Sequence, residues 1–164
     1  MNNFFKAITA TILIAAITTV PVFAATPAAA EKADQIVSEI IRPGMTDAQK
    51  VQACNDYLIK NLSYDYSFTN CTADSALTNG SATPEGYADS FKLLMDACSI
   101  PCQIVKNADL DHTWNRVYIK GVPYEVDVSM NDSSESNDFT LITAEEFFQN
   151  LLYCVDVHSY VDKT

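Results

Sequence analysis

The sequence is poor in basic residues, and it contains neither a C-x-x-C pair nor an apolar run long enough to span a membrane. Its 164 residues include 10 Lys and Arg against 21 Asp and Glu, which gives a formal net charge of −11. A chain this acidic repels nucleic acid and anionic membrane surfaces, so neither is expected as a partner. The absence of a C-x-x-C pair excludes a zinc ribbon.

No metal or cofactor is expected from the acidic and sulfur-containing residues that are present. The acidic side chains between residues 109 and 138 do not follow the spacing of a calcium-binding loop. An odd number of cysteines leaves at least one free thiol or an intermolecular bond in a secreted protein. One internal disulfide is possible, but the sequence does not identify the partners among Cys54, Cys71, Cys98, Cys102 and Cys154.

The first 24 residues have the pattern of a secretory signal peptide. The short segment MNNFFK precedes the apolar run AITATILIAAITTV, and PVFA offers a cleavage site near Ala24. We therefore expect a secreted protein that has no membrane segment after cleavage. We divide the rest of the chain into an N-terminal helical segment, residues 25–45, and one domain, residues 46–164. The sequence gives no indication of an oligomeric state.

Hydrophobic periodicity changes from helical to alternating near residue 100, which predicts an α+β fold with N-terminal helices packed on an antiparallel sheet. Thr46 and Thr83 are good N-caps, and Pro84 suits the first position of a helix that runs to about Ala97. Helices are expected over 31–41, 46–62, 84–97 and 144–152, with a helical turn ending at 79–80. Strands are expected over 102–107, 112–119 and 122–129, a polar loop over 130–138, and a further strand in the tail, 153–164.

The turn Lys120-Gly121 predicts a two-residue hairpin that brings His112 and Asp127 onto one face of the sheet. In that register Trp114 lies opposite Asp127. His112 is then the diagonal neighbour of Asp127, roughly 6–8 Å away at the backbone. A carboxylate beside an imidazole orients the ring and raises its basicity. From the residues alone, the pair is either part of an active site or a hydrogen bond that only stabilises the sheet.

Two segments of the sequence resemble the core of the transglutaminase-like superfamily. They are NGSATPEGYADSFKLLMDACSIPCQIV and DHTWNRVYIKGVPYEVDVSMND, and the upstream YLIKNLSYDYSF resembles the family's helix followed by Y-D-Y. The motifs occur in the family's order and spacing over residues 46–132. The resemblance implies a papain-like α+β core, in which a cysteine at a helix N-terminus faces a sheet that carries His and Asp.

Matched residue by residue, the resemblance assigns the catalytic His to His112 and the catalytic Asp to Asp127. The family's nucleophilic cysteine directly precedes E-G-Y-A, and here that residue is Pro84. Proline has no nucleophile and no backbone N–H, whereas in the family that N–H commonly contributes to the oxyanion hole. The resemblance also places Glu85, Trp114 and Asn115 in the cleft.

Three functions remain open at this stage. The first is a secreted domain without catalytic cysteine that binds a peptide, protein or cell-wall ligand. The second is a cysteine hydrolase or protein-glutamine acyl-transferase that uses a displaced thiol, for which Cys71 is the candidate. The third is a structural extracellular module. An open cleft beside Trp114 without a thiol would favour the first function, a thiol facing His112 would favour the second, and a filled cleft would favour the third.

Overall fold

A computed structural model describes residues 25–161, with side chains described to residue 152. The predicted signal peptide, residues 1–24, and the side chain of Cys154 lie outside this part of the chain. Within residues 25–161, no helix combines the length and apolar character needed to cross a membrane.

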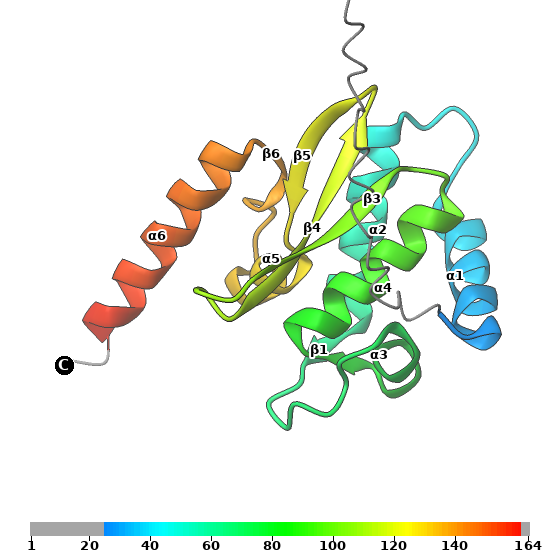
Figure 1. Ribbon diagram of the computed structural model, residues 1–164. Helices are drawn as coiled ribbons and strands as arrows, with labels where there is room; N and C mark the ends of the chain where they lie inside the picture. The colour runs from blue at the N-terminus through cyan, green and yellow to red at the C-terminus, as the bar shows by residue number, and fades with distance from the viewer. Residues whose placement is uncertain (1–24, 162–164) are drawn as a thin grey trace, which may run out of the picture.

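The fold is α+β, with helices on both faces of an antiparallel sheet (Figure 1). The strand order is β3-β4-β5-β6, and a separate pair of two-residue strands, β1 and β2, runs parallel. The elements in chain order are α1 (Pro27–Ile40), α2 (Asp47–Asn61), β1 (Ser63–Tyr64), α3 (Ala73–Asn79), β2 (Ser81–Ala82), α4 (Pro84–Ala97), β3 (Cys102–Asn107), β4 (His112–Ile119), β5 (Val122–Val126), α5 (Val128–Ser134), β6 (Thr140–Ile142) and α6 (Ala144–Val161).

The helices begin where their capping residues predict. Thr46 and Gln49 form a capping box, in which the Thr46 N–H donates to Gln49 Oε1 over 2.9 Å and the Gln49 N–H donates to Thr46 Oγ1. Thr83 accepts from the Gly86 N–H at the start of α4. The first helix begins earlier than the apolar periodicity indicates, at Pro27, because Thr26 caps it.

Three sequence predictions from β5 onwards are wrong. The strand expected over 122–129 ends at Val126, because the side chain of Asp127 accepts from the Met130 N–H and caps α5. Helix α5 therefore replaces most of the polar loop expected over 130–138. Within the described part of the tail, residues 153–161, the expected strand is replaced by α6, which continues to Val161 with no proline or glycine to interrupt it. The short strand β6 was not predicted.

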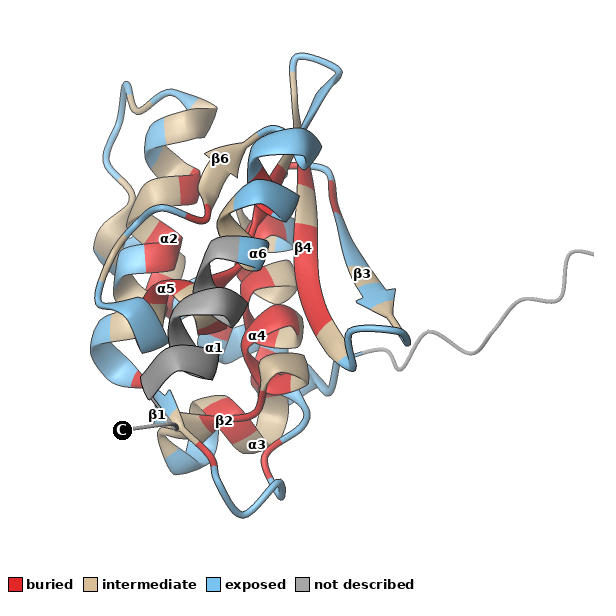
Figure 2. Cartoon of the chain, turned by 90° about the vertical axis from the view of Figure 1, so that its left-hand side faces the viewer, coloured by how far each residue is buried: buried red, intermediate tan, exposed pale blue. Residues whose placement is uncertain are grey.

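Helix α4 lies at the centre of the main core, which the first two helices and the sheet complete. Figure 2 shows α4 and β4 side by side, both largely buried. The helix contributes Tyr87, Phe91, Leu94 and Met95, each at most 1 % exposed. The N-terminal segment that we separated at residue 45 joins the same cluster through buried residues of α1. A smaller cluster on the other face of the sheet packs Trp114 and Phe139 against Phe147 of α6.

Candidate functional site

The strand β4 begins at His112, next to the point where the chain leaves β5. Asn115 pairs with Val126 in the antiparallel ladder, which is the register that the two-residue turn predicts. Asp127 follows directly, and its Oδ2 lies 2.5 Å from His112 Nε2. The hydrogen bond takes up Nε2 of the ring, so Nδ1 is the ring nitrogen left to face another group.

The Asp127 carboxylate is buried and held from several directions. Its second oxygen, Oδ1, accepts from Ser129 Oγ over 2.8 Å and from the Met130 N–H over 3.0 Å. Its own N–H donates to the carbonyl of Phe139. With 1 % of its surface exposed, Asp127 presents one oriented oxygen to the imidazole. Sequence reasoning missed the roles of Ser129 and Met130, although an Asp before a helix start is a recognisable capping signal.

Opposing effects act on the pKa of His112. Burial of the ring lowers it, whereas the hydrogen bond and negative charge of Asp127 raise it, and the charges of Glu85 and Asp111 act in the same direction. The net result is a pKa above the usual value of 6.5. The imidazole is therefore more basic than an ordinary histidine.

A direct contact fixes β4 against the first turns of α4. Asn115 Nδ2 donates to the carbonyl of Ala88 over 2.9 Å. Pro84 lies one helical turn before Ala88, and His112 lies three residues before Asn115 on the strand. The first residue of α4, Pro84, and the first residue of β4, His112, therefore each lie only a few residues from this contact.

The N-terminus of α4 has few donors left for a ligand. Pro84 has no N–H, the Gly86 N–H donates to Thr83 Oγ1, and the Tyr87 N–H donates to the Thr83 carbonyl. Among the described residues, the Glu85 N–H is then the one donor of this turn without a partner. A helix start of this kind offers much less to a developing oxyanion than one with free N–H groups.

The loop that joins β1 to α3 closes over the start of α4. The carbonyl of Asn70 accepts from the Thr83 N–H over 3.1 Å, and a Cβ added at Gly86 would lie 2.2 Å from it. Asp65 holds the loop by accepting from the N–H groups of Ser67, Thr69 and Asn70. The hydroxyl of Ser67, which also donates to Asp65, and these N–H groups keep the pKa of Asp65 well below its usual range. The glycine of E-G-Y-A is thus required by a close approach of backbone.

The cleft-lining residues implied by the resemblance lie in different surroundings. Trp114 is 3 % exposed, donates from Nε1 to Glu125 Oε2 and stacks on Phe147 at a centroid distance of 4.8 Å. Asn115 is fully buried on the opposite face of β4. The structure places both inside the protein, whereas Glu85 remains partly exposed at the start of α4.

A second contact near the site links α4 to α5. Tyr87, the tyrosine of E-G-Y-A, is 1 % exposed and donates from its hydroxyl to Asp132 Oδ2 over 2.6 Å. Burial and this carboxylate raise the pKa of Tyr87 above its usual value. The tyrosine is therefore a neutral donor that anchors α5, the helix capped by Asp127. The polar loop predicted over 130–138 includes Asp132 and gave no indication of this contact.

Three other thiols, of Cys54, Cys98 and Cys102, lie away from the start of α4. Cys98 caps the C-terminal end of the helix, 14 residues or about 20 Å from Pro84. Cys54 lies beside it, with 3.9 Å between the two sulfur atoms. Cys102 faces Asn115, and burial raises the pKa of its thiol to about 12. None of the three is placed to act on a group bound beside position 84.

Cys71 is the one exposed cysteine among those whose side chains are described, and it lies in the loop that covers α4. Its neighbour Asn70 contacts the face of α4 that carries Gly86. Ala88, whose carbonyl faces β4, is two residues further on and so about 200° around the helix. The loop and β4 therefore approach α4 from different sides, and the Cys71 thiol donates to the Phe68 carbonyl of its own loop.

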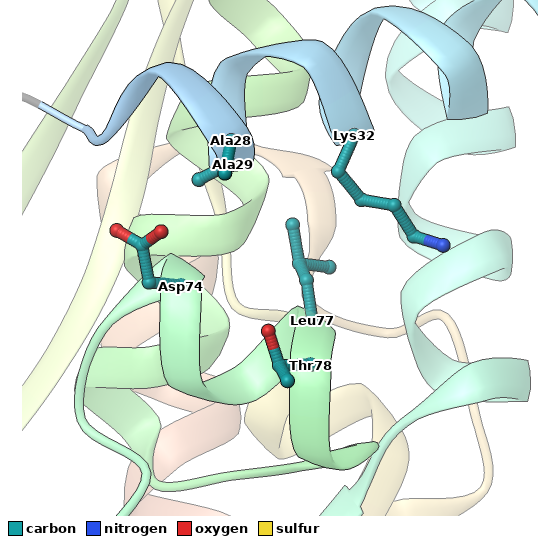
Figure 3. A pocket seen from close by; sticks show the side chains of 6 residues that line it. All are labelled: Ala28, Ala29, Lys32, Asp74, Leu77 and Thr78. Carbon is teal, nitrogen blue, oxygen red and sulfur yellow. The ribbon is translucent and has the colours of Figure 1, made fainter.

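A hollow in the surface lies between α1 and α3, away from the His112–Asp127 pair (Figure 3). None of its lining residues belongs to α4, β4 or α5. Leu77 points into it from α3 and Lys32 extends along its edge from α1. The hollow contains no group of the candidate site.

Comparisons with known proteins agree with the architecture. Two solved structures share the fold: a TGase, with a TM-score of 0.52 at 16 % identity over 67 % of this chain and 35 % of that one, and a protein from Cytophaga hutchinsonii provisionally named a cysteine protease, with a TM-score of 0.51 at 21 % identity over 61 % and 37 %. The chain thus spans little more than a third of their lengths.

None of the curated proteins compared with the chain matches it. The sequence profile of the Transglutaminase-like superfamily, in contrast, matches residues 34–128. This segment runs from α1 through the N-terminus of α4 to the end of β5, and so includes Pro84, His112 and Asp127. Because the match covers more than half of the chain, the protein belongs to the transglutaminase-like superfamily.

Proposed function

We propose that the protein is a secreted transglutaminase-like domain that has lost the thiol chemistry of its family and acts by binding a ligand. The observation that carries the proposal is the identity of the first residue of α4. Pro84 directly precedes Glu85-Gly86-Tyr87-Ala88, the position of the cysteine in the motif, while His112 and Asp127 keep their hydrogen bond.

Thiol catalysis needs a nucleophile, a base to deprotonate it and donors for the oxyanion. His112 has a raised pKa and an oriented carboxylate partner, so a base is present. A proline at position 84 supplies neither the nucleophile nor an N–H. His112 and Asp127 therefore form a base that has no thiol at position 84 to deprotonate.

A binding role uses the groups that remain. His112, at the start of β4, and Glu85, in the first turn of α4, are both partly exposed. The net charge of −11 favours a ligand with positive charge. We propose a peptide, protein or cell-wall ligand with a basic group, held beside His112 and Glu85.

The position of Cys71 supports a second candidate function. Cys71 is exposed, and its loop contacts the start of α4 through Asn70. A displaced thiol in this loop would make the protein a cysteine hydrolase or acyl-transferase. The approach of the loop from a different side of α4 than β4 argues against this function.

Amine incorporation into a glutamine-containing protein and cleavage of an unstructured protein test the catalytic half of the proposal. We expect no activity above background for the wild type or for Cys71→Ala. Activity in the wild type that disappears in Cys71→Ala would establish the displaced thiol and overturn the proposal.

Calorimetric titration tests the binding half. The probes are a lysine-rich peptide, soluble peptidoglycan fragments and an acidic peptide of the same length. We expect binding of a probe with a basic group and a loss of at least tenfold in affinity in Glu85→Gln with His112→Gln. A Lys32→Gln variant, altered at the hollow between α1 and α3, serves as the control. Equal binding by all variants, or binding of no basic probe, would contradict this half.

A further inference from the structure

Cys54 and Cys98 meet where α2 packs against the C-terminal end of α4. Their sulfur atoms are 3.9 Å apart, although the two residues are 44 positions apart in sequence. Cys54 is fully buried, whereas Cys98 is partly exposed. Among the cysteines whose side chains are described, this is the one pair with thiols in contact.

We propose that Cys54 and Cys98 form a disulfide in the oxidised protein, which cross-links α2 to the C-terminal end of α4. A disulfide has a sulfur–sulfur distance of about 2.05 Å. Each sulfur would therefore move by about 1 Å from its position in the thiol form. The two helices already pack together in one core cluster, so the bond joins segments that are held close without it.

The other described cysteines are worse placed for this bond. The Cys102 sulfur faces the side-chain amide of Asn115 and the carbonyl of Gln103. Cys71 is in the loop between β1 and α3, where its thiol contacts Phe68. Neither is recorded in contact with another sulfur, whereas Cys54 and Cys98 face each other.

The environment indicates which sulfur reacts first. The hydrogen bond with Cys54 lowers the pKa of Cys98, and Lys50 acts in the same direction, while burial and Asp47 oppose it. The hydrogen bond with Cys98 and burial raise the pKa of Cys54. Cys98, partly exposed and more acidic, is therefore the thiol that an external oxidant reaches as a thiolate.

Oxidation by a small-molecule disulfide then proceeds in two balanced exchanges. The Cys98 thiolate attacks one sulfur of the external disulfide, which forms a mixed disulfide and releases one thiolate. Cys54 loses its proton to solvent, and its sulfur attacks the Cys98 sulfur, releasing the second thiolate. Two protein thiols are oxidised by two electrons in total, and the external disulfide is reduced to two thiols.

The cross-link would close a loop that contains β1, α3, β2 and the whole of α4. Restricting this loop in the unfolded chain stabilises the folded state. The bond lies at the far end of α4 from Pro84, so it fixes the helix that carries the candidate site without touching the site. The proposal does not depend on the proposed function.

Peptide mapping tests the pairing directly. The chain is purified without reductant, equilibrated with oxidised glutathione, alkylated and digested with trypsin. Cleavage after Lys50, Lys60, Lys92 and Lys106 gives peptide 51–60 with Cys54 and peptide 93–106 with both Cys98 and Cys102. We expect these peptides to be linked, and fragmentation of the linked product to assign the bond to Cys98.

Two variants serve as a matched pair. The link should persist in Cys102→Ser and disappear in Cys98→Ser. Reduction should lower the melting temperature of the wild type and Cys102→Ser by roughly 10 °C and leave Cys98→Ser unchanged. Alkylated Cys54 in the oxidised wild type, or a bond from Cys54 to any cysteine other than Cys98, would overturn the proposal. Fragmentation of the wild-type product decides the pairing even if a variant fails to fold.

Discussion

Asp127 has two roles at the residue scale. One of its oxygens caps α5 by accepting from the Met130 N–H, and the other accepts from His112. A residue that starts a helix is fixed in position by the fold, so the carboxylate keeps its orientation whether or not a ligand is bound. The rigidity of the pair therefore comes from secondary structure as well as from the hydrogen bond itself.

The titration of His112 is the first prediction. Asp127 outweighs burial, so we expect its pKa, measured by NMR, to lie above 6.5. In Asp127→Asn burial remains without the carboxylate charge, and the pKa should fall below 6.5 while asparagine still accepts from the Met130 N–H. The His112→Gln variant assigns the resonance. A pKa that is the same in both proteins would show that the pair is not formed in solution.

This shift also sets a pH dependence of stability. The folded pKa of His112 is raised above the unfolded value, so the folded state binds the proton more tightly. The resulting stability is fully present below about pH 6.5 and is lost as the pH rises through the folded pKa. Comparing urea unfolding of the wild type and His112→Gln across this range isolates the contribution.

Gly86 gives a second prediction at the residue scale. A Cβ at this position would lie 2.2 Å from the backbone carbonyl of Asn70, which cannot move aside as a flexible side chain would. We expect Gly86→Ala to lower the free energy of unfolding by about 3 kcal/mol, the upper end of the cost of overpacking. Urea denaturation measures the change.

Ser90, on the same helix, provides the matched control. Its hydroxyl is buried without a hydrogen-bond partner in the structure, so Ser90→Ala removes an unsatisfied group. This change should be neutral or stabilising. A Gly86→Ala variant as stable as Ser90→Ala would show that the loop does not press on the start of α4.

At the scale of elements, α4 is closed at both ends by local motifs. Thr83 and Pro84 begin it, and the C-terminal end turns back on itself beyond Cys98. The Ile100 N–H donates to the Met95 carbonyl and the Ser99 N–H donates to that of Asp96, which is a Schellman motif. Ser99 occupies its left-handed position with φ of 58°, where glycine is usual.

The third prediction concerns this position. Ser99→Gly relieves the left-handed strain, and we expect the free energy of unfolding to rise by about 0.5–1 kcal/mol. Ser38→Gly, within the regular helix α1, should lower it by a similar amount. Thermal unfolding of the two variants measures both changes. A loss of stability in Ser99→Gly would mean that this end of α4 differs from the structure.

The elements differ in how well the sequence predicts them. Caps and the turn at Lys120-Gly121 are local signals, and they fix the starts of α2 and α4 and the hairpin register. The end of β5 is harder to predict, because Asp127 can either continue the strand or cap a helix. Contacts with Met130, inside α5, and with Phe139, which follows α5, favour the cap.

At the scale of the whole molecule, packing of distant segments decides which candidate residues are accessible. Strand parity places Trp114 on the same face as His112, and their rings stack at a centroid distance of 6.2 Å. Helix α6 covers the tryptophan with Phe147, a contact 33 residues away that no local pattern indicates. The sequence thus predicts the His112–Asp127 contact, but it does not predict that Trp114 and Asn115 are buried.

The acidity of the chain and the helices on both faces of the sheet affect which ligand can bind at His112. Helices cover both faces of the sheet (Figure 1), and His112 remains partly exposed at the first residue of β4. Asp127 behind His112, together with Glu85 and Asp111, keeps this region acidic. A ligand that binds here must complement negative charge, which links the local geometry to the charge of the molecule.

Restoring a cysteine at position 84 tests the central claim most directly. In Pro84→Cys the new thiol would start α4, where the helix dipole and His112 both favour the thiolate. The background carries Cys71→Ser, because residues 71 and 84 share the tryptic peptide 61–92. The measurement is the pH dependence of iodoacetamide labelling at residue 84. We predict a midpoint at least one unit below the ordinary thiol value of about 8.5, and a rise in that midpoint in His112→Ala. A midpoint near 8.5 that His112→Ala leaves unchanged would contradict the account.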